Sequence, residues 1–177
     1  MPSQTLEITS SLIDAQLLPF SNEQYREGVR FLSFPLTAEV DGLIPLADLQ
    51  GVIKVAVGDI SPVPHVNEFW LGIINSQGEA AWILDLAGLL GMTHWCRRPF
   101  VAQRGMAMLV EVNNLTLGLL VEQVKAIKNY PPESCLSISP GMFPPRLRNF
   151  LQGYFLDKEA RTSILLDVER LTQTLGL

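Results

Sequence analysis

The amino-acid sequence predicts an all-β fold of two small barrels with a few short helices. Short apolar runs recur from residue 29 onward, and Gly, Pro, Asn and Asp residues separate them, which is typical of strands joined by turns. The pattern of the first half also returns in the second, which indicates that one barrel is made twice. The clearest runs are Arg30–Leu36, Gly51–Val57, Ala80–Leu84, Met106–Val112 and Leu115–Val121.

Turn and proline signals mark the ends of these strands. Asn113-Asn114 separates two apolar runs and predicts a tight hairpin, because Asn tolerates a positive φ angle. Proline has no N–H group to donate within a central strand, so prolines between the runs indicate connections. These prolines are Pro62, Pro64, Pro131, Pro132, Pro140, Pro144 and Pro145.

Two short helices are expected, each directly after a strand. One spans about Leu86–Leu90 and is closed by Gly91. The other is C-terminal, spans about Val168–Leu175 and is closed by Gly176.

The internal repeat consists of three pairs of segments in the same order. Their apolar positions match at offsets of 75, 81 and 82 residues. Each half, of about 75 residues, is therefore expected to form one barrel, and the two barrels to share a core where they meet. The pairs are Ile44–Val52 with Leu119–Ile127, Gly72–Ile74 with Gly153–Phe155, and Ile83–Leu86 with Leu165–Val168.

The N-terminal residues differ in texture from the rest. Residues 1–28 are polar and irregular, so we expect a partly ordered extension followed by one domain at residues 29–177. Ser11–Leu18 resembles a capped helical turn that Pro19 ends. The extension either packs on the domain as a solvated tail or serves as a docking peptide.

Composition narrows the class of protein. The 13 basic and 18 acidic residues give a formal charge of −5, which argues against a broad nucleic-acid surface. Two cysteines favour a reducing compartment over a disulfide framework. Neither a signal peptide nor an apolar run long enough to span a membrane is visible, so we expect a cytoplasmic protein.

No pattern of residues predicts catalysis, a metal site or a cofactor. The only His and Cys residues are His65, His94, Cys96 and Cys135, and their spacing matches no zinc or nucleophile motif. The sequence contains no phosphate-binding loop and no nucleophile elbow. Asp85 and Asp167 each precede a helix, where we expect them to act as N-caps, although a catalytic carboxylate pair is the alternative.

The three tryptophans suggest where a partner could bind. Trp82 lies in mid-strand and is expected in the core. Trp70 and Trp95 lie at element ends and are either core residues or interface anchors, since Trp is enriched in binding hot spots.

Ordered motifs across residues 29–176 follow a pattern known from one protein family. Leu71–Glu79 followed by Trp82–Leu86 matches apolar-Gly-apolar-x-Asn-Leu-Arg-Gly, a strand, and Asp-Leu. Gly118–Val124 matches a Gly-apolar-apolar-Val-Asp-x-Val segment, and Ile164–Leu171 matches a terminal strand and helix. In this order and spacing, the motifs resemble those of the CheW-like chemotaxis coupling (adaptor) proteins.

This resemblance implies a fold and a role. The fold would be two five-stranded SH3-like barrels around a common hydrophobic core. The role would be a non-catalytic scaffold, without cofactor, that couples the cytoplasmic tips of methyl-accepting chemoreceptors to the regulatory domain of a CheA-type histidine kinase. Chemotaxis, phototaxis and pilus motility all use such systems.

The resemblance also implies two sets of binding residues. Four of these residues, Leu46, Leu49, Val124 and Ile127, are apolar and could instead simply pack in the core. The residues on the implied kinase contact are Leu46, Leu49, Gly51 and Val52. The residues implied in receptor coupling are Gly72, Asn75, Gln77, Gly78, Val124 and Ile127.

Two departures from the family pattern leave a second role open. Gln77 replaces the usual Arg, and Gly51 replaces a common acidic residue, so two interface charges are missing. A regulatory binder that occupies kinase or receptor without activating the kinase is therefore the main alternative. An enzyme that uses His94 and Cys96, and a small-ligand carrier, are the two others.

Overall fold

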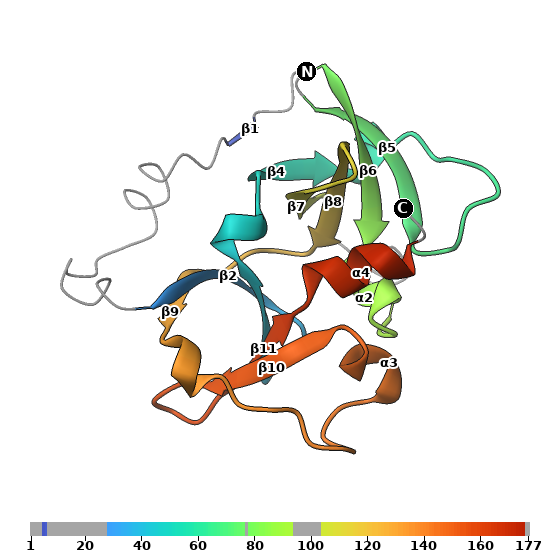
Figure 1. The fold of residues 1–177 in the computed structure, drawn as a ribbon. Helices are drawn as coiled ribbons and strands as arrows, with labels where there is room; N and C mark the ends of the chain where they lie inside the picture. The colour runs from blue at the N-terminus through green and yellow to red at the C-terminus, as the bar shows by residue number, and fades with distance from the viewer. Residues whose placement is uncertain (1–4, 7–27, 77, 94–103, 176–177) are drawn as a thin grey trace. The chain divides into compact units, whose positions relative to one another are not determined.

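The computed structural model of the chain describes residues 5–6, 28–76, 78–93 and 104–175. They form two compact units, each built on one curled β-sheet (Figure 1). Unit 1 comprises residues 49–123 and a short N-terminal strand, and unit 2 comprises the chain just before residue 49 and that from 124 onward. The predicted all-β fold with two five-stranded barrels is confirmed, while the common core stays a prediction.

Unit 1 is a sheet of five strands with a short sixth strand at one edge. The strand order is β1-β4-β7-β8-β6-β5, in which only β6 and β8 run parallel. The 3-10 helix Val57–Asp59 follows β4, and α2 (Leu86–Leu89) follows β6. The strands are β1 (Thr5–Leu6), β4 (Gly51–Ala56), β5 (Trp70–Ser76), β6 (Glu79–Asp85), β7 (Arg104–Val112) and β8 (Leu115–Val121).

Unit 2 repeats this arrangement with five strands. The order is β10-β11-β3-β2-β9, in which only β11 and β3 run parallel. Its strands are β2 (Val29–Pro35), β3 (Val40–Pro45), β9 (Ile127–Tyr130), β10 (Leu151–Leu156) and β11 (Thr162–Leu166). Its helical elements are 3-10 turns at Leu46–Asp48 and Pro132–Ser134, α3 (Pro145–Arg148) and α4 (Val168–Thr174).

The two units are equivalent strand by strand, but they are not the two halves of the sequence. Strands β4, β7, β8, β6 and β5 of unit 1 take the places of β9, β2, β3, β11 and β10 in unit 2. The expectation that each half of the sequence forms one barrel is wrong, because the boundaries of the units do not divide the sequence into two halves. The parallel pairing of β11 with β3 joins the first two long strands to the C-terminal ones, so unit 2 is assembled from both parts of the chain.

Local devices recur at equivalent places in the two units. The ladders β5–β6 and β10–β11 each shift register beside a glycine, Gly72 and Gly153. Each unit has an isolated bridge from the preceding loop to the edge strand, Ser61 with Ile73 in unit 1 and Leu136 with Tyr154 in unit 2. A bridge of this kind covers an otherwise open strand edge and limits unwanted pairing with other chains.

The predicted Asn113-Asn114 turn and the two aspartate caps are confirmed, whereas Gly176 and the helical turn expected at Ser11–Leu18 lie outside the described residues. Asn113 and Asn114 have φ angles of 49° and 63°, as a tight hairpin between β7 and β8 requires. Asp85 accepts a hydrogen bond from the Gly88 amide at the start of α2. Asp167 accepts one from the Arg170 amide at the start of α4, so both aspartates are N-caps.

Each sheet curls around its own apolar cluster. The cluster of unit 2 is aromatic, and Tyr130 stacks on Phe155 with ring centroids 4.4 Å apart. The cluster of unit 1 is aliphatic and consists of Ile53, Val55, Ile74, Ala81, Ile83, Ala107, Leu109 and Leu120. The buried residues of unit 2's cluster are Phe31, Leu43, Phe155 and Leu165.

Candidate functional site

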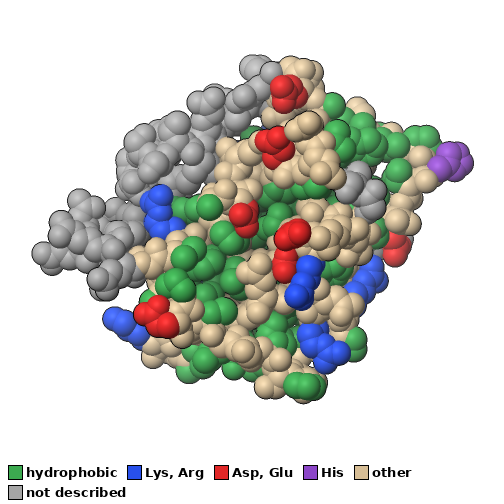
Figure 2. Space-filling model, viewed as in Figure 1, with side chains coloured by type: hydrophobic (Ala, Val, Ile, Leu, Met, Phe, Trp, Pro, Cys, Tyr) green, Lys and Arg blue, Asp and Glu red, His purple; other side chains and the backbone are tan. Residues whose placement is uncertain are grey.

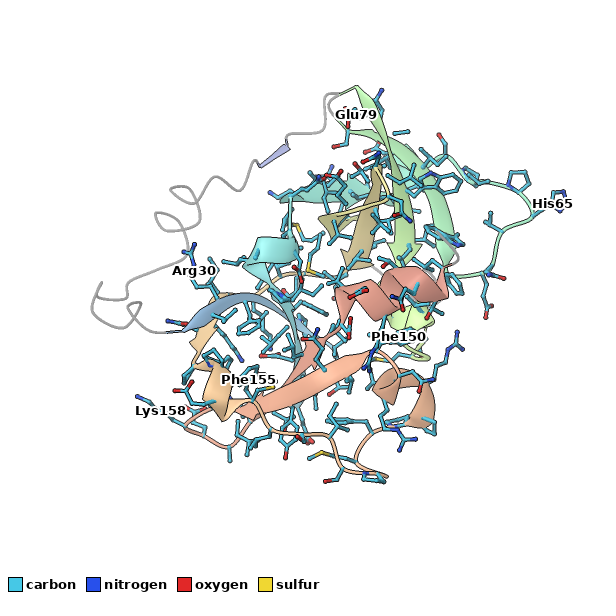
Figure 3. The ribbon with its side chains drawn as sticks, viewed as in Figure 1. Arg30, His65, Glu79, Phe150, Phe155 and Lys158 are labelled. Atoms are coloured by element: carbon cyan, nitrogen blue, oxygen red, sulfur yellow. The ribbon has the colours of Figure 1, made fainter. Side chains whose placement is uncertain are left out.

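The β5–β6 hairpin of unit 1 holds three of the residues expected in receptor coupling. The Gly78 amide donates a 2.9 Å hydrogen bond to Asn75 Oδ1, and Gly78 has a φ of 90°. Asn75 and Gly78 are exposed, and Glu79 follows them at the tip of the hairpin (Figure 3). The Asn75 side chain and the Gly78 backbone are thus joined by a hydrogen bond at an exposed, polar place. Gln77 lies outside the described residues.

Gly72, the third of these residues, has a structural role. It is buried, has a φ of 141°, and passes so close to the preceding loop that a Cβ atom would lie 2.1 Å from the Ser61 carbonyl oxygen. Ser61 and Ile73 exchange two backbone hydrogen bonds of 2.8 and 2.9 Å at this point. Only glycine allows this close approach, so Gly72 sets how β5 packs against the Ser61 loop. Because it has no side chain, Gly72 has none with which to contact a partner.

An aromatic pair lies on the same hairpin. Trp70 and Trp82 meet edge to face, with ring centroids 5.6 Å apart. Both side chains are half-buried, so Trp82 is less enclosed than the sequence indicated. Trp95 lies outside the described residues.

The residues of the expected kinase contact follow one another from unit 2 into unit 1. Leu46 lies in the 3-10 turn of unit 2 and is half-buried, as is Leu49 of unit 1. Gly51 and Val52 begin β4, and Val52 is only 5% exposed. Leu49 therefore offers a partner more apolar surface than Val52 does.

Gly51 has room for a larger side chain. A Cβ atom built there meets no heavy atom of the described residues within 4 Å, and the residue has no positive φ. The acidic residue common in the family would therefore fit. Packing among the described residues therefore does not demand glycine at this position.

β4 also carries a feature that the sequence did not predict. The two-residue strand β1 pairs with it in antiparallel fashion, with Leu6 opposite Val52 and Thr5 opposite Ile53. Thr5–Leu6 lies among polar N-terminal residues and shows no alternating apolar pattern. This strand could therefore not be predicted from the spacing of apolar residues.

Val124 and Ile127 belong to unit 2. Ile127 starts β9 and is 8% exposed, which fits core packing, whereas Val124 is half-buried. The structure thus groups Gly72, Asn75 and Gly78 on one hairpin, and places Val124 and Ile127 on a separate segment of unit 2.

A charged network fixes that segment of unit 2. Lys125 and Lys128 both form ion pairs with Asp41 of β3, and Lys128 Nζ also donates a 2.9 Å hydrogen bond to Ser163 Oγ. Burial opposes the ionisation of Asp41, but the two lysine hydrogen bonds outweigh it and hold the pKa of Asp41 below its usual value. The network ties the start of β9 to β3 and β11.

The described residues offer no grouping of reactive side chains. His65 is exposed in a loop of unit 1 (Figure 3), and Cys135 packs against the aromatic cluster of unit 2. No three His, Cys, Asp or Glu side chains among the described residues could hold a metal ion together. His94 and Cys96 lie outside those residues.

Two surface properties bear on the kind of partner. On the face drawn in Figure 2, the Lys and Arg side chains of the described residues are interspersed with Asp and Glu. Such mixing is typical of an ordinary protein surface and differs from the continuous basic stripe of nucleic-acid binders. Within the described part of the chain, no helix is both long enough and apolar enough to cross a membrane.

Comparison with known proteins agrees with this architecture. The family model of the CheW-like domain matches residues 30–175. The crystal structure of the scaffolding protein TtCheW from Thermoanaerobacter tengcongensis is similar in fold, with a TM-score of 0.69 and 21% identity over 85% of this chain and 96% of that one. No curated protein matches the sequence. Because the family model spans most of the sequence, the chain belongs to the CheW-like domain family.

Proposed function

We propose that the chain is a non-catalytic cytoplasmic scaffold that couples chemoreceptors to a CheA-type histidine kinase. The role is to hold two partners in a fixed geometry, and no bond chemistry is required of the chain. The kinase's regulatory domain would bind at Leu46, Leu49, Gly51 and Val52. The receptor tip would bind near the β5–β6 hairpin and the Val124–Ile127 segment.

The observation that carries this proposal is the match of residues 30–175 to the CheW-like domain. The similarity to a crystallised scaffolding protein agrees with it in fold. A scaffold needs rigid surfaces. In support of the proposal, each unit has its own buried apolar cluster, and a loop residue bridges the edge strands β5 and β10. The half-buried Leu49 provides apolar surface of the kind that anchors protein interfaces.

A binding titration against the regulatory domain of the cognate kinase tests the kinase contact. Leu49→Asp places a charge on the expected contact and should abolish micromolar binding. Leu115→Asp is the matched control, because Leu115 is a 39% exposed leucine of the same unit outside the expected contact. Equal binding by both variants would place the contact elsewhere, and no binding by the unsubstituted protein would refute coupling.

The second candidate is a regulatory binder that occupies its partner without activating the kinase. The observation in its favour is the absence of two interface charges, at Gly51 and Gln77. Since interface charges set specificity and association rate, their loss would alter partner choice. Kinase autophosphorylation in the presence of receptor separates the roles, because an adaptor raises it and a regulatory binder leaves it unchanged or lowers it.

A further inference from the structure

The strand β1 covers part of the strand that carries two of the expected kinase-contact residues. On one side, β4 pairs with β7 over its whole length, from Gly51 to Ala56. On the other side, among the described residues, β1 pairs with two residues of β4, Val52 and Ile53. One edge of β4 is therefore fixed within the sheet, while the other is held by a very short strand.

β1 is an addition to the repeated architecture. β9 is the counterpart of β4 in unit 2, and among the described residues no strand pairs with the outer edge of β9. The CheW-like match begins at residue 30, well after β1. The strand order that the two units share is complete without β1, so β1 is not needed to build the barrel.

So short a strand is easily displaced. Two residues make few ladder hydrogen bonds, and the gain from these is offset by the entropy lost on ordering the segment. An open strand edge is also a ready template for an extended partner segment. A partner that pairs with most of the six residues of β4 would make more hydrogen bonds than β1 does.

We propose that β1 is an intramolecular competitor of the kinase. In the free protein it covers the outer edge of β4, and docking of the kinase's regulatory domain at Gly51 and Val52 requires its release. The inference rests on the proposed function. Because the apparent dissociation constant equals the intrinsic one divided by the uncovered fraction, a β1 that is paired nine-tenths of the time weakens binding about tenfold.

The double variant Thr5→Pro/Leu6→Pro tests the competition in the full-length chain. Successive residues of a strand direct their N–H groups to opposite sides, so replacing both residues removes whichever N–H faces β4. Thr5→Val/Leu6→Val is the matched control, because it keeps both N–H groups and strand-forming side chains. Hydrogen exchange at the amides of Val52 and Ile53 measures how well β1 protects β4. Calorimetric titration with the kinase's regulatory domain measures the affinity.

The proline variant is expected to exchange faster at whichever of these two amides faces β1 and to bind the kinase domain about three- to tenfold more tightly. The valine control should match the unsubstituted protein in both measurements. Equal affinity in all three proteins would overturn the competition while leaving the coupling role intact. Weaker binding by the proline variant would also overturn it, because β1 would then be part of the binding surface. Binding by none of the three would refute the coupling role and the competition with it.

Discussion

Replacing Gly72 with alanine should disrupt the edge of the unit 1 sheet at a defined point. The added Cβ would lie 2.1 Å from the carbonyl oxygen of Ser61 and 2.7 Å from its carbonyl carbon. Both are backbone atoms, so no side-chain rotation can relieve the clash. Ser61 must move away from Ile73, and their two backbone hydrogen bonds must break.

The expected cost follows from two contributions. An alanine held at a φ of 141° is strained by about 1–3 kcal/mol. Losing two backbone hydrogen bonds costs about 0.5–1.5 kcal/mol each. Gly72→Ala should therefore lower the free energy of unfolding by roughly 2–6 kcal/mol, a large part of the total stability of an ordinary domain.

Two other glycines separate these contributions. Gly78 has a φ of 90°, but no described atom lies within 4 Å of where its Cβ would be, so Gly78→Ala should show only the backbone strain, about 1–3 kcal/mol. Gly51 has no described atom within 4 Å of where its Cβ would be and no positive φ. Gly51→Ala should therefore leave stability unchanged or raise it by about 0.4–1 kcal/mol, because alanine restricts the unfolded chain.

Urea unfolding of the three variants measures these free energies, with the slope of each curve checked for constancy. Gly72→Ala should be the least stable, and its difference from Gly78→Ala reports the clash alone. If Gly72→Ala proved as stable as Gly78→Ala, the close approach of the Ser61 loop to β5 would be refuted.

Three further substitutions test the local chemistry of the fold. Asp85→Ala removes the cap of the Gly88 amide and should cost about 0.5–2 kcal/mol in urea unfolding, whereas Asp85→Asn keeps an acceptor and should cost less. Because the pKa of Asp41 is lowered, its ionised form stabilises the fold above about pH 4, and this contribution is lost as the pH falls through the folded-state pKa. In thermal melts recorded from pH 2 to 7, Asp41→Asn should reduce the loss of stability at low pH. An unchanged loss would contradict the network. Asn114→Gly should preserve stability, while Asn114→Val should lower it by about 1–2 kcal/mol in the same melts, since Asn114 has a φ of 63°.

The elements that sequence reasoning located best are those with strong local signals. The strand predicted at Leu115–Val121 matches β8 at both ends, and the helix predicted at Leu86–Leu90 differs from α2 by one residue. Alternating apolar residues, a turn pair and a capping aspartate each act within a few residues. Such signals can be recognised from one sequence without knowledge of the fold.

Features that depend on distant segments escaped the sequence. The parallel pairing of β3 with β11 joins residues about 120 positions apart, and no local pattern indicates it. For this reason the repeat was recognised while its division between the two units was not. The Asp41–Lys128 ion pair, 87 positions apart, escaped for the same reason.

The candidate binding residues divide in the same way. Asn75 and Gly78 were expected from one local motif, and the structure joins them by a hydrogen bond between strand β5 and the turn that follows it. The low exposure of the Val52 side chain could not be predicted from the sequence, because burial depends on packing by strands elsewhere in the chain. The binding roles themselves stay predictions.

The most direct test of the account is receptor-dependent kinase autophosphorylation with and without this protein. The mixture contains the cognate CheA-type kinase, receptor in membranes and either the unsubstituted chain, Leu49→Asp or Leu115→Asp. A scaffold that couples the two partners should raise the phosphorylation rate, and Leu49→Asp should remove that increase while Leu115→Asp keeps it. A rate that stays unchanged or falls when the unsubstituted chain is added would contradict coupling.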